Sequence, residues 1–254
     1  ATDAPGTHWV LKPCMAGGSQ GITVISAEDV LNGQYTFTGP TVAQEYVASP
    51  YLGFGGGKFH LRVYVLVTRW SPPAVYLYDN GFVFRSRHKY DKSHRDTTRD
   101  MFSVQSDSVE GLPFSDLWNH LDSITPVVRE NTSASVWARI QEVFREMLGQ
   151  NLRESFGNFQ QTEEQRGHGC FDLFGADVIL DSRLEPYVME INTGPNIWVD
   201  DRGEGNRRQM TDVKGPLIEE LVDWIALRLR QPPTSLSEAE QIEQGTLRNF
   251  SKVL

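Results

Sequence analysis

The stretch that decides the fold is CFDLFGADVILDSRLEPYVMEIN, residues 170–192. Its apolar pattern predicts two antiparallel strands, and a symmetric pairing places apolar side chains opposite one another on one face. On the other face Asp177 lies opposite Glu190, and Asn192 follows two residues later. Directly opposed like charges destabilise a sheet unless a cation lies between them. Two carboxylates and an amide oxygen suit Mg²⁺, which takes oxygen ligands and shares them with substrate phosphates.

A solvated hairpin face is the alternative, because antiparallel strands with one wet side alternate in the same way. Ile179 and Val188 would lie on that wet face, which weighs against this interpretation. The exit Asn192-Thr-Gly-Pro195 is a tight turn that would hold the amide in place. The metal site is therefore preferred.

The bulk composition narrows the class of protein. Of 254 residues, 39% are hydrophobic and 22% charged, which is ordinary for a globular protein. The net charge of −9 argues against a general nucleic-acid binder. No apolar run approaches the roughly 20 residues that span a bilayer, and the start does not resemble a signal peptide. Cys14 and Cys170 are expected to be reduced, packed thiols of a cytosolic protein.

One short stretch is basic although the whole chain is acidic. Its basic side chains are Arg85, Arg87, His88, Lys89, Lys92, His94, Arg95 and Arg99. A solvated loop is one interpretation. The other is a binding site for an anionic substrate, for which Arg85, Arg87 and Lys89 are the candidates.

A glycine-rich loop lies between two predicted strands near the start of the chain. Residues 9–12 and 22–25 have strand character, and residues 16–21 read Ala-Gly-Gly-Ser-Gln-Gly. Glycine lets backbone N–H groups approach an anion closely. The loop is not a P-loop, because Lys12 precedes the glycines and no helix signature follows. A phosphate flap and an ordinary turn both remain open.

Further strands are predicted at residues 42–47 and 59–67. In the second of these, His60, Arg62 and Tyr64 share one face. A functional role of Arg62 is preferred over a structural ion pair, because it lies on a polar strand face.

A hairpin is predicted from strands at residues 74–78 and 82–87, joined by the turn Asp79-Asn80-Gly81. Helical spacing of apolar residues predicts a helix over residues 133–152 and a closing helix that begins at Pro216. A polar tail with modest helical character follows.

These pieces, in this order, resemble the tubulin tyrosine ligase-like family of ATP-grasp enzymes. Four blocks carry the resemblance, and they occupy residues 9–21, 44–47, 58–68 and 170–195. The resemblance implies an α+β ATP-grasp fold, in which nucleotide is held between a small β-rich flap domain and a larger mixed α/β C-terminal domain. The expected divisions are residues 1–48 for flap and hinge strand, 49–231 for the C-terminal domain and 232–254 for a tail.

The resemblance also implies an activity. It is that of an ATP- and Mg²⁺-dependent ligase that joins glutamate, glycine or tyrosine to a carboxylate of tubulin or another acidic protein through an acylphosphate. The implied cofactors are ATP and Mg²⁺, and the implied partners are the protein substrate and the amino acid. No nucleic acid or membrane is expected as a partner, and the expected location is the cytoplasm, beside the cytoskeleton.

Site residues carry over from the family by position. Arg62 and Glu190 are the expected catalytic residues, and Asp177, Glu190 and Asn192 the expected magnesium ligands. The expected nucleotide-binding residues are Lys12, Gly17, Gly18, Gln20, Gly21, Gln44, Glu45, Tyr46, Val47, Lys58, His60 and Arg62.

Three positions depart from the family pattern. His60 stands where the family has Asp, and Gln20 and Phe84 stand where it has Arg. These changes keep open a degenerate member that binds nucleotide or tubulin without catalysis. A third hypothesis is an ATP-grasp enzyme for a small-molecule carboxylate.

Overall fold

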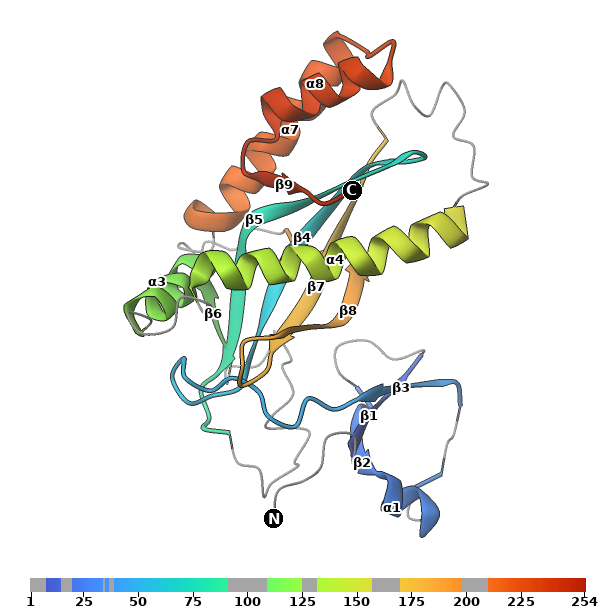
Figure 1. Ribbon diagram of the computed structural model, residues 1–254, viewed down its shortest axis with the longest axis vertical. Helices are drawn as coiled ribbons and strands as arrows, with labels where there is room; N and C mark the ends of the chain where they lie inside the picture. Colours follow the sequence, from blue (N-terminus) through green and yellow to red (C-terminus); the bar gives the residue numbers. More distant parts are fainter. Residues whose placement is uncertain are drawn as a thin grey trace. The chain divides into compact units, whose positions relative to one another are not determined.

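The computed structural model describes most of the chain as two compact units (Figure 1). The first unit comprises Ala1–Phe59, Phe84–Glu110 and Leu180–Arg183, and the second comprises His60–Val83, Gly111–Ile179 and Leu184–Leu254. The residues that the structure describes are 8–14, 20–33, 35–36, 39–90, 109–124, 132–156, 170–197 and 210–254.

The first unit contains a small antiparallel sheet. Its strands are β1 (His8–Pro13), β2 (Thr23–Ser26) and β3 (Thr41–Glu45), in the order β2-β1-β3. The strands predicted at residues 9–12, 22–25 and 42–47 are thereby confirmed. The sequence analysis missed the short helix α1 (Ala27–Leu31), which begins with a capping box between Ser26 and Asp29.

The glycine-rich segment at residues 53–57 of the same unit, with the adjoining Lys58, packs against residues 86–90. The amide of Ser86 donates to the carbonyl oxygen of Lys58 at 2.9 Å, and the amide of Tyr90 donates to that of Gly56 at 3.1 Å. A Cβ atom on Gly57 would lie 2.2 Å from the carbonyl oxygen of Ser86. Glycine at this position therefore permits a close approach of two backbones.

The second unit is built on a larger sheet with the order β6-β5-β4-β7-β8. Its strands are β4 (Phe59–Trp70), β5 (Pro73–Ser86), β6 (Val109–Pro113), β7 (Asp172–Leu180) and β8 (Pro186–Thr193). The two central strands β4 and β7 pair antiparallel and are buried along most of their length. The predicted strands at residues 59–67 and on either side of Asp181 are confirmed.

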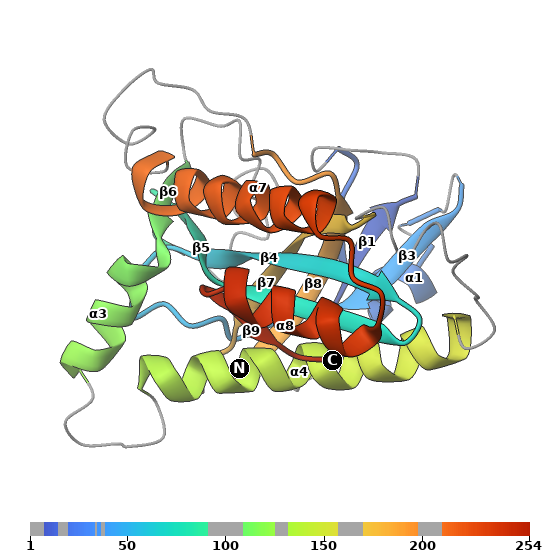
Figure 2. The same cartoon turned by 90° about the horizontal axis from the view of Figure 1, so that it is seen from above.

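Helices cover both faces of this sheet. Figure 2 shows α4 (Ser133–Phe156) on one side and α7 (Gly215–Arg230) on the other. The first face also receives α3 (Phe114–Ile124), and a π-helical turn η2 (Met210–Lys214) leads into α7. Both predicted helices are confirmed, and their inward residues are fully buried: Val136, Ile140, Phe144, Leu217 and Trp224.

The hairpin predicted around Asp79-Asn80-Gly81 is wrong, because β5 runs through these residues as one continuous strand. The Asn80 side chain accepts a hydrogen bond from the Gly81 amide at 2.8 Å. A Cβ atom on Gly81 would lie 2.3 Å from the carbonyl oxygen of Arg62 and 2.7 Å from the Phe114 ring. The glycine therefore allows neighbouring groups to approach the strand, and it makes no turn.

The tail is part of the second unit. It forms α8 (Leu236–Thr246) and a short strand β9 (Phe250–Lys252), which pairs antiparallel with β5. Glu243 of α8 is fully buried and accepts a hydrogen bond from the Tyr76 hydroxyl at 2.7 Å. The modest helical character predicted for the tail is confirmed, and its anchoring to β5 is additional.

Two further predictions concern thiols and membranes. Cys14 and Cys170 are free thiols, but both are exposed, so the prediction that they are packed is wrong. Among the described helices, none combines the length and the apolar character needed to cross a membrane.

Candidate functional site

Arg62 and Asp177 form a close ion pair on one face of the larger sheet. The antiparallel register of β4 and β7 sets the two residues directly opposite each other. Arg62 Nε lies 2.5 Å from Asp177 Oδ1, and its Nη2 lies 3.0 Å from Oδ2. Asp177 is only 5% exposed. Such a bidentate contact fixes the plane of the guanidinium as well as its position.

The charge of Arg62 is stabilised by its surroundings. Burial by itself would lower the pKa of Arg62, but the hydrogen bonds and charge of Asp177 outweigh it and raise the pKa, with a further contribution from Glu190. A buried His60 also lies nearby, with its Nε2 atom 3.7 Å from Asp177 Oδ1. Arg62 therefore presents a permanent positive charge beside two carboxylates.

Glu190 and Asn192 are neighbours on β8. They lie two residues apart and so share a face of the strand, and Asn192 Nδ2 donates to Glu190 Oε1 at 3.0 Å. Glu190 is exposed and Asn192 half-buried. The predicted direct opposition of Asp177 and Glu190 remains a prediction, whereas the cation that contacts Asp177 is Arg62.

The predicted magnesium ligands fit that metal in their chemistry. Asp177, Glu190 and Asn192 offer carboxylate and amide oxygens only, and Arg62 lies close enough to both carboxylates for each to raise its pKa. Among the described residues no three or more His, Cys, Asp or Glu side chains group as a metal cluster. A small set of oxygen donors is typical of Mg²⁺, which completes its shell with water and substrate phosphates.

The sequence analysis missed Lys214, which adds a second cationic side chain to this region. It ends η2, and its Nζ atom lies 5.7 Å from the centroid of the Phe82 ring. Phe82 contacts Tyr64, which shares a strand face with Arg62. Burial lowers the pKa of Lys214, and the charge of Arg62 lowers it further. Its position just before the Gly-Pro start of α7 is a signal that could have drawn attention to it.

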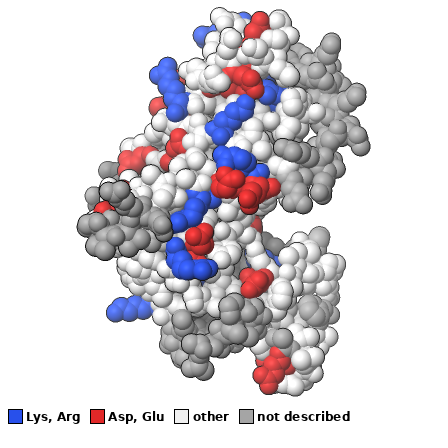
Figure 3. Space-filling model, viewed as in Figure 1, with Lys and Arg blue, Asp and Glu red and all other residues white. Residues whose placement is uncertain are grey.

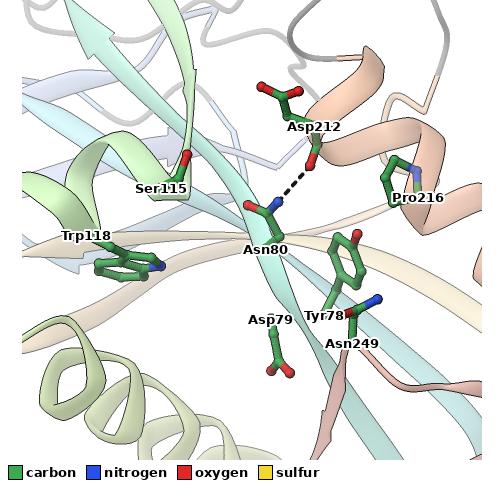
Figure 4. A pocket seen from close by; sticks show the side chains of 8 residues that line it. All are labelled: Tyr78, Asp79, Asn80, Ser115, Trp118, Asp212, Pro216 and Asn249. Atoms are coloured by element: carbon green, nitrogen blue, oxygen red, sulfur yellow. Dashed lines mark hydrogen bonds between the residues drawn. The ribbon is translucent and has the colours of Figure 1, made fainter.

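A pocket with a volume of about 330 Å³ lies in the same unit, but none of the predicted site residues lines it (Figure 4). Asn80 Nδ2 donates to the carbonyl oxygen of Asp212 at 2.8 Å across it. This bond ties β5 to the turn that carries Lys214. The lining residues are Tyr78, Asp79, Asn80, Ser115, Trp118, Asp212, Pro216 and Asn249.

The predicted nucleotide-binding residues of the first unit lie on its small sheet and the loops beside it. Lys12 is on β1, and Gln44 and Glu45 are on β3, which pairs with β1. Gln20 and Gly21 precede β2, and Gly21 has a φ of 70°. Gly17 and Gly18 lie outside the described residues. The described part of the loop lies between the paired strands β1 and β2, and its role as a phosphate flap stays a prediction.

Lys58 of the first unit lies against two tyrosines. Its Nζ atom is 4.7 Å from the centroid of the Tyr46 ring and 6.0 Å from that of Tyr90. Tyr46 follows β3 directly and was among the predicted residues, as was Val47, whereas Tyr90 was not. The structure thus brings Lys58 and the segment after β3 together.

The predicted basic patch is only partly described. Arg85 Nη2 lies 2.7 Å from Glu110 Oε2, and its guanidinium stacks 4.6 Å from the centroid of the Phe54 ring. Arg87 and Lys89 are exposed, and residues 91–108 lie outside the described part. On the face that Figure 3 shows, described basic and acidic side chains alternate rather than gather by sign. A substrate patch therefore stays a prediction, now centred on Arg87 and Lys89.

Comparison with solved structures bears on the fold. The C-terminal domain of K. lactis Pby1, described as an ATP-grasp enzyme interacting with the mRNA decapping enzyme Dcp2, superposes with a TM-score of 0.62. The match covers 98% of this chain and 62% of that domain, at 20% sequence identity. The chain therefore has the predicted ATP-grasp fold.

Curated proteins with similar sequences are tubulin-modifying enzymes. Tubulin monoglutamylase TTLL4 of Mus musculus is 27% identical over 85% of this chain, and tubulin glycylase 3F of Tetrahymena thermophila is 25% identical over 74%. Tubulin polyglutamylase ttll-4 of Caenorhabditis elegans is 26% identical over 94%. The chain spans 18%, 22% and 39% of the length of these three relatives.

A family model also matches most of the chain. The model described as the tubulin-tyrosine ligase family matches residues 1–232, which include every block that carries the resemblance found in the sequence. The chain belongs to the tubulin-tyrosine ligase family.

Proposed function

We propose that the protein is an ATP- and Mg²⁺-dependent ligase that joins glutamate, glycine or tyrosine to a carboxylate of tubulin or another acidic protein. The observation that carries the proposal is the bidentate Arg62–Asp177 pair, with Glu190 acting on the same guanidinium. Membership of the family and the names of its glutamylase and glycylase relatives support the substrate class. The protein would act in the cytoplasm, at microtubules.

The proposed reaction has two steps. An oxygen of the acceptor carboxylate attacks the γ-phosphorus of ATP, so that ADP leaves and an acylphosphate forms. The amine of the incoming amino acid then attacks the carbonyl carbon, the C–O bond to phosphate breaks, and phosphate leaves as the nitrogen loses a proton. Negative charge spreads over the phosphoryl oxygens during the first step. Arg62 and Lys214 would stabilise that charge from one sheet face.

Asp177, Glu190 and Asn192 would hold the magnesium ion. When bound, such an ion would supply positive charge against the negative charge that develops on the phosphoryl oxygens. The fork of the Arg62 guanidinium would fix the orientation of the Asp177 carboxylate.

The nucleotide would be bound chiefly by the first unit. Lys12, Gln20 and the glycines of the flap would contact its phosphates, and Gln44 to Val47 would receive the adenine. Lys58 and His60 would reach the nucleotide as well. In this proposal residues 1–48 form flap and hinge, residues 49–231 the C-terminal domain, and the remainder the tail that anchors to β5.

A second candidate is a degenerate ligase that binds nucleotide or tubulin without catalysis. Phe84 favours it, because an apolar and largely buried ring, 7% exposed, stands where the family has an arginine. Lys214 weighs against it, because it supplies another cation on the face that bears Arg62.

One assay separates the two candidates. The full chain is incubated with Mg²⁺-ATP, tubulin and labelled glutamate, glycine or tyrosine. ATP-dependent incorporation that Glu190→Gln abolishes supports the ligase. Binding of Mg²⁺-ATP with no incorporation of any of the three amino acids supports the degenerate protein and contradicts the ligase.

A further inference from the structure

The Lys58 ammonium lies in a small cluster with two phenols. Its Nζ atom lies over the Tyr46 ring, at 4.7 Å, and near the Tyr90 ring, at 6.0 Å. Nζ also donates to Tyr46 Oη at 3.4 Å, and the Tyr46 and Tyr90 hydroxyls are 2.9 Å apart. The two tyrosines are thus linked to each other and to the same lysine.

Three separate segments of the first unit meet in this cluster, and the backbone anchors each one. The Tyr46 amide donates to the carbonyl oxygen of His8 at 3.0 Å, which ties the end of β3 to β1. The Lys58 carbonyl accepts from Ser86, and the Tyr90 amide donates to Gly56. Main-chain hydrogen bonds therefore anchor the backbone from which each of the two rings projects.

Such a cluster restricts a side chain that is otherwise flexible. Lysine carries its charge on a four-carbon stem and loses much rotamer freedom when it binds an anion. A ring face attracts the ammonium without neutralising it. Tyrosines that hold the ammonium in place before a ligand arrives remove part of that cost, which is the general basis of preorganised binding.

We propose that Tyr90 is a positioning residue that, together with Tyr46, holds the Lys58 ammonium in the orientation in which it binds nucleotide. This inference rests on the proposed function in one respect, namely that Lys58 contacts the nucleotide. Tyr90 itself touches Lys58 and Tyr46, and it acts through them. The alternative is that Tyr90 only packs the segment after β5 against the glycine-rich segment.

A double-mutant cycle distinguishes the two roles. The dissociation constant of Mg²⁺-ATP is measured by calorimetry for the full chain and for Tyr90→Ala, Lys58→Met and the double variant. Tyr90→Ala is expected to weaken binding roughly 2- to 30-fold, the range of a cation–π contact. In the Lys58→Met background the same substitution is expected to have no further effect. Tyr90→Phe keeps the ring and is expected to restore most of the affinity.

Tyr51→Ala is the matched control. Tyr51 belongs to the same unit, is half-buried, and packs its ring against Phe59 at 6.2 Å. Any loss of affinity that Tyr51→Ala causes through packing is expected to be equal in the otherwise wild-type protein and in the Lys58→Met background. Thermal unfolding of every variant accompanies the binding measurements.

Three results would overturn the inference. A Tyr90→Ala effect of equal size in the Lys58→Met background shows that Tyr90 acts through packing alone. Unchanged affinity in Tyr90→Ala shows that no positioning occurs. Unchanged affinity in Lys58→Met removes Lys58 from the nucleotide site but leaves the ligase proposal standing. A wild-type protein that fails to bind Mg²⁺-ATP contradicts the proposed function itself.

Discussion

Asp177 and Glu190 are both proposed metal ligands, but they differ in burial. Asp177 is 5% exposed and paired with Arg62, whereas Glu190 is exposed. Removing one partner of a buried pair leaves an uncompensated charge and costs about 3–5 kcal/mol. Asp177→Ala is therefore expected to lower the free energy of unfolding by about that amount, measured by urea denaturation.

Glu190→Ala is the control for this prediction. It is expected to change the free energy of unfolding by no more than about 0.5 kcal/mol, as exposed substitutions do. Both variants are expected to lose ATP-dependent incorporation. Equal stability losses in the two variants would contradict the burial argument.

The phenol of Tyr78 is expected to make the protein less stable at alkaline pH. Burial, followed by the charges of Glu220 and Asp79, raises its pKa to about 12 from 10.0. Between these two values the folded protein keeps a proton that the unfolded chain loses, so stability falls as pH rises, by up to about 1.4 kcal/mol per pH unit for this group. Burial raises the pKa of Tyr64 and Tyr76 as well and adds to the same fall.

The measurement is the free energy of unfolding between pH 9 and pH 11.5. Tyr78→Phe is expected to flatten its decline above pH 10. Tyr187→Phe serves as control, because Tyr187 is 44% exposed. A decline that Tyr78→Phe leaves as steep as in the wild type would show that this phenol does not contribute.

The sequence alone could predict which site residues lie side by side only where they are close together in the chain. Glu190 and Asn192 lie two residues apart on one strand, so alternation alone assigns them to one face. The Arg62–Asp177 pair spans 115 positions, and no local pattern links these two residues. The neighbour of Lys214, Phe82, also belongs to a distant strand, and the only local sign of Lys214 is its place before the Gly-Pro start of α7.

Strand β5 shows why turn chemistry misled the prediction. Asn-Gly between apolar runs is a strong hairpin signal, yet β5 continues through it. Pairing with β4 on one edge and with β6 and β9 on the other stabilises an extended chain. These partners come from elsewhere in the sequence, so tertiary contacts override the local preference.

Gly175 of β7 leaves room for the Arg62 stem. A Cβ atom there would lie 2.9 Å from Pro195 Cβ and 3.0 Å from Arg62 Cδ. Gly175→Ala is therefore expected to displace Arg62, to destabilise the protein by about 1–3 kcal/mol, and to slow ATP-dependent incorporation. Denaturant unfolding and the incorporation assay measure the two effects.

Gly149 of α4 provides the same substitution in a different setting. Its added Cβ atom would meet Leu254 Cδ2 at an ordinary 3.5 Å. Gly149→Ala is expected to stabilise the protein by about 0.5–1 kcal/mol through helix propensity, with incorporation unchanged. The idea of crowding at Gly175 fails if both alanine variants change stability in the same direction.

The C-terminal helix α8 is anchored by a buried carboxylate. Glu243 accepts from Tyr76, and its Oε1 atom lies 3.9 Å from Arg69 Nη1. Glu243→Ala leaves the largely buried Arg69 without this partner, and a loss of about 3–5 kcal/mol in the free energy of unfolding is expected. Glu240 lies 3.7 Å from Arg69 Nη2 and also pairs with Lys252, but its carboxylate is 41% exposed, so Glu240→Ala is expected to cost at most about 1 kcal/mol. A similar loss in both variants would argue against an anchoring role.

At the scale of the whole molecule, the fold was predictable because several local signals occur in a fixed order. The paired strands around the glycine loop, the long strand that carries Arg62 and the hairpin around Asp181 are each recognisable from alternation and turn residues. The packing of the tail was not predictable, because its sequence is polar and nothing in it distinguishes the buried carboxylate of Glu243 from the exposed ones.

The central claim is that the site transfers a phosphoryl group to a carboxylate of an acidic protein. The most direct test uses tubulin whose acceptor carboxylates carry ¹⁸O, with Mg²⁺-ATP and the amino acid that is incorporated. An acylphosphate pathway predicts one ¹⁸O atom in the phosphate released for each amide bond formed, and no such phosphate with Glu190→Gln. Phosphate that forms without ¹⁸O, or nucleotide that binds without turnover, would contradict the account.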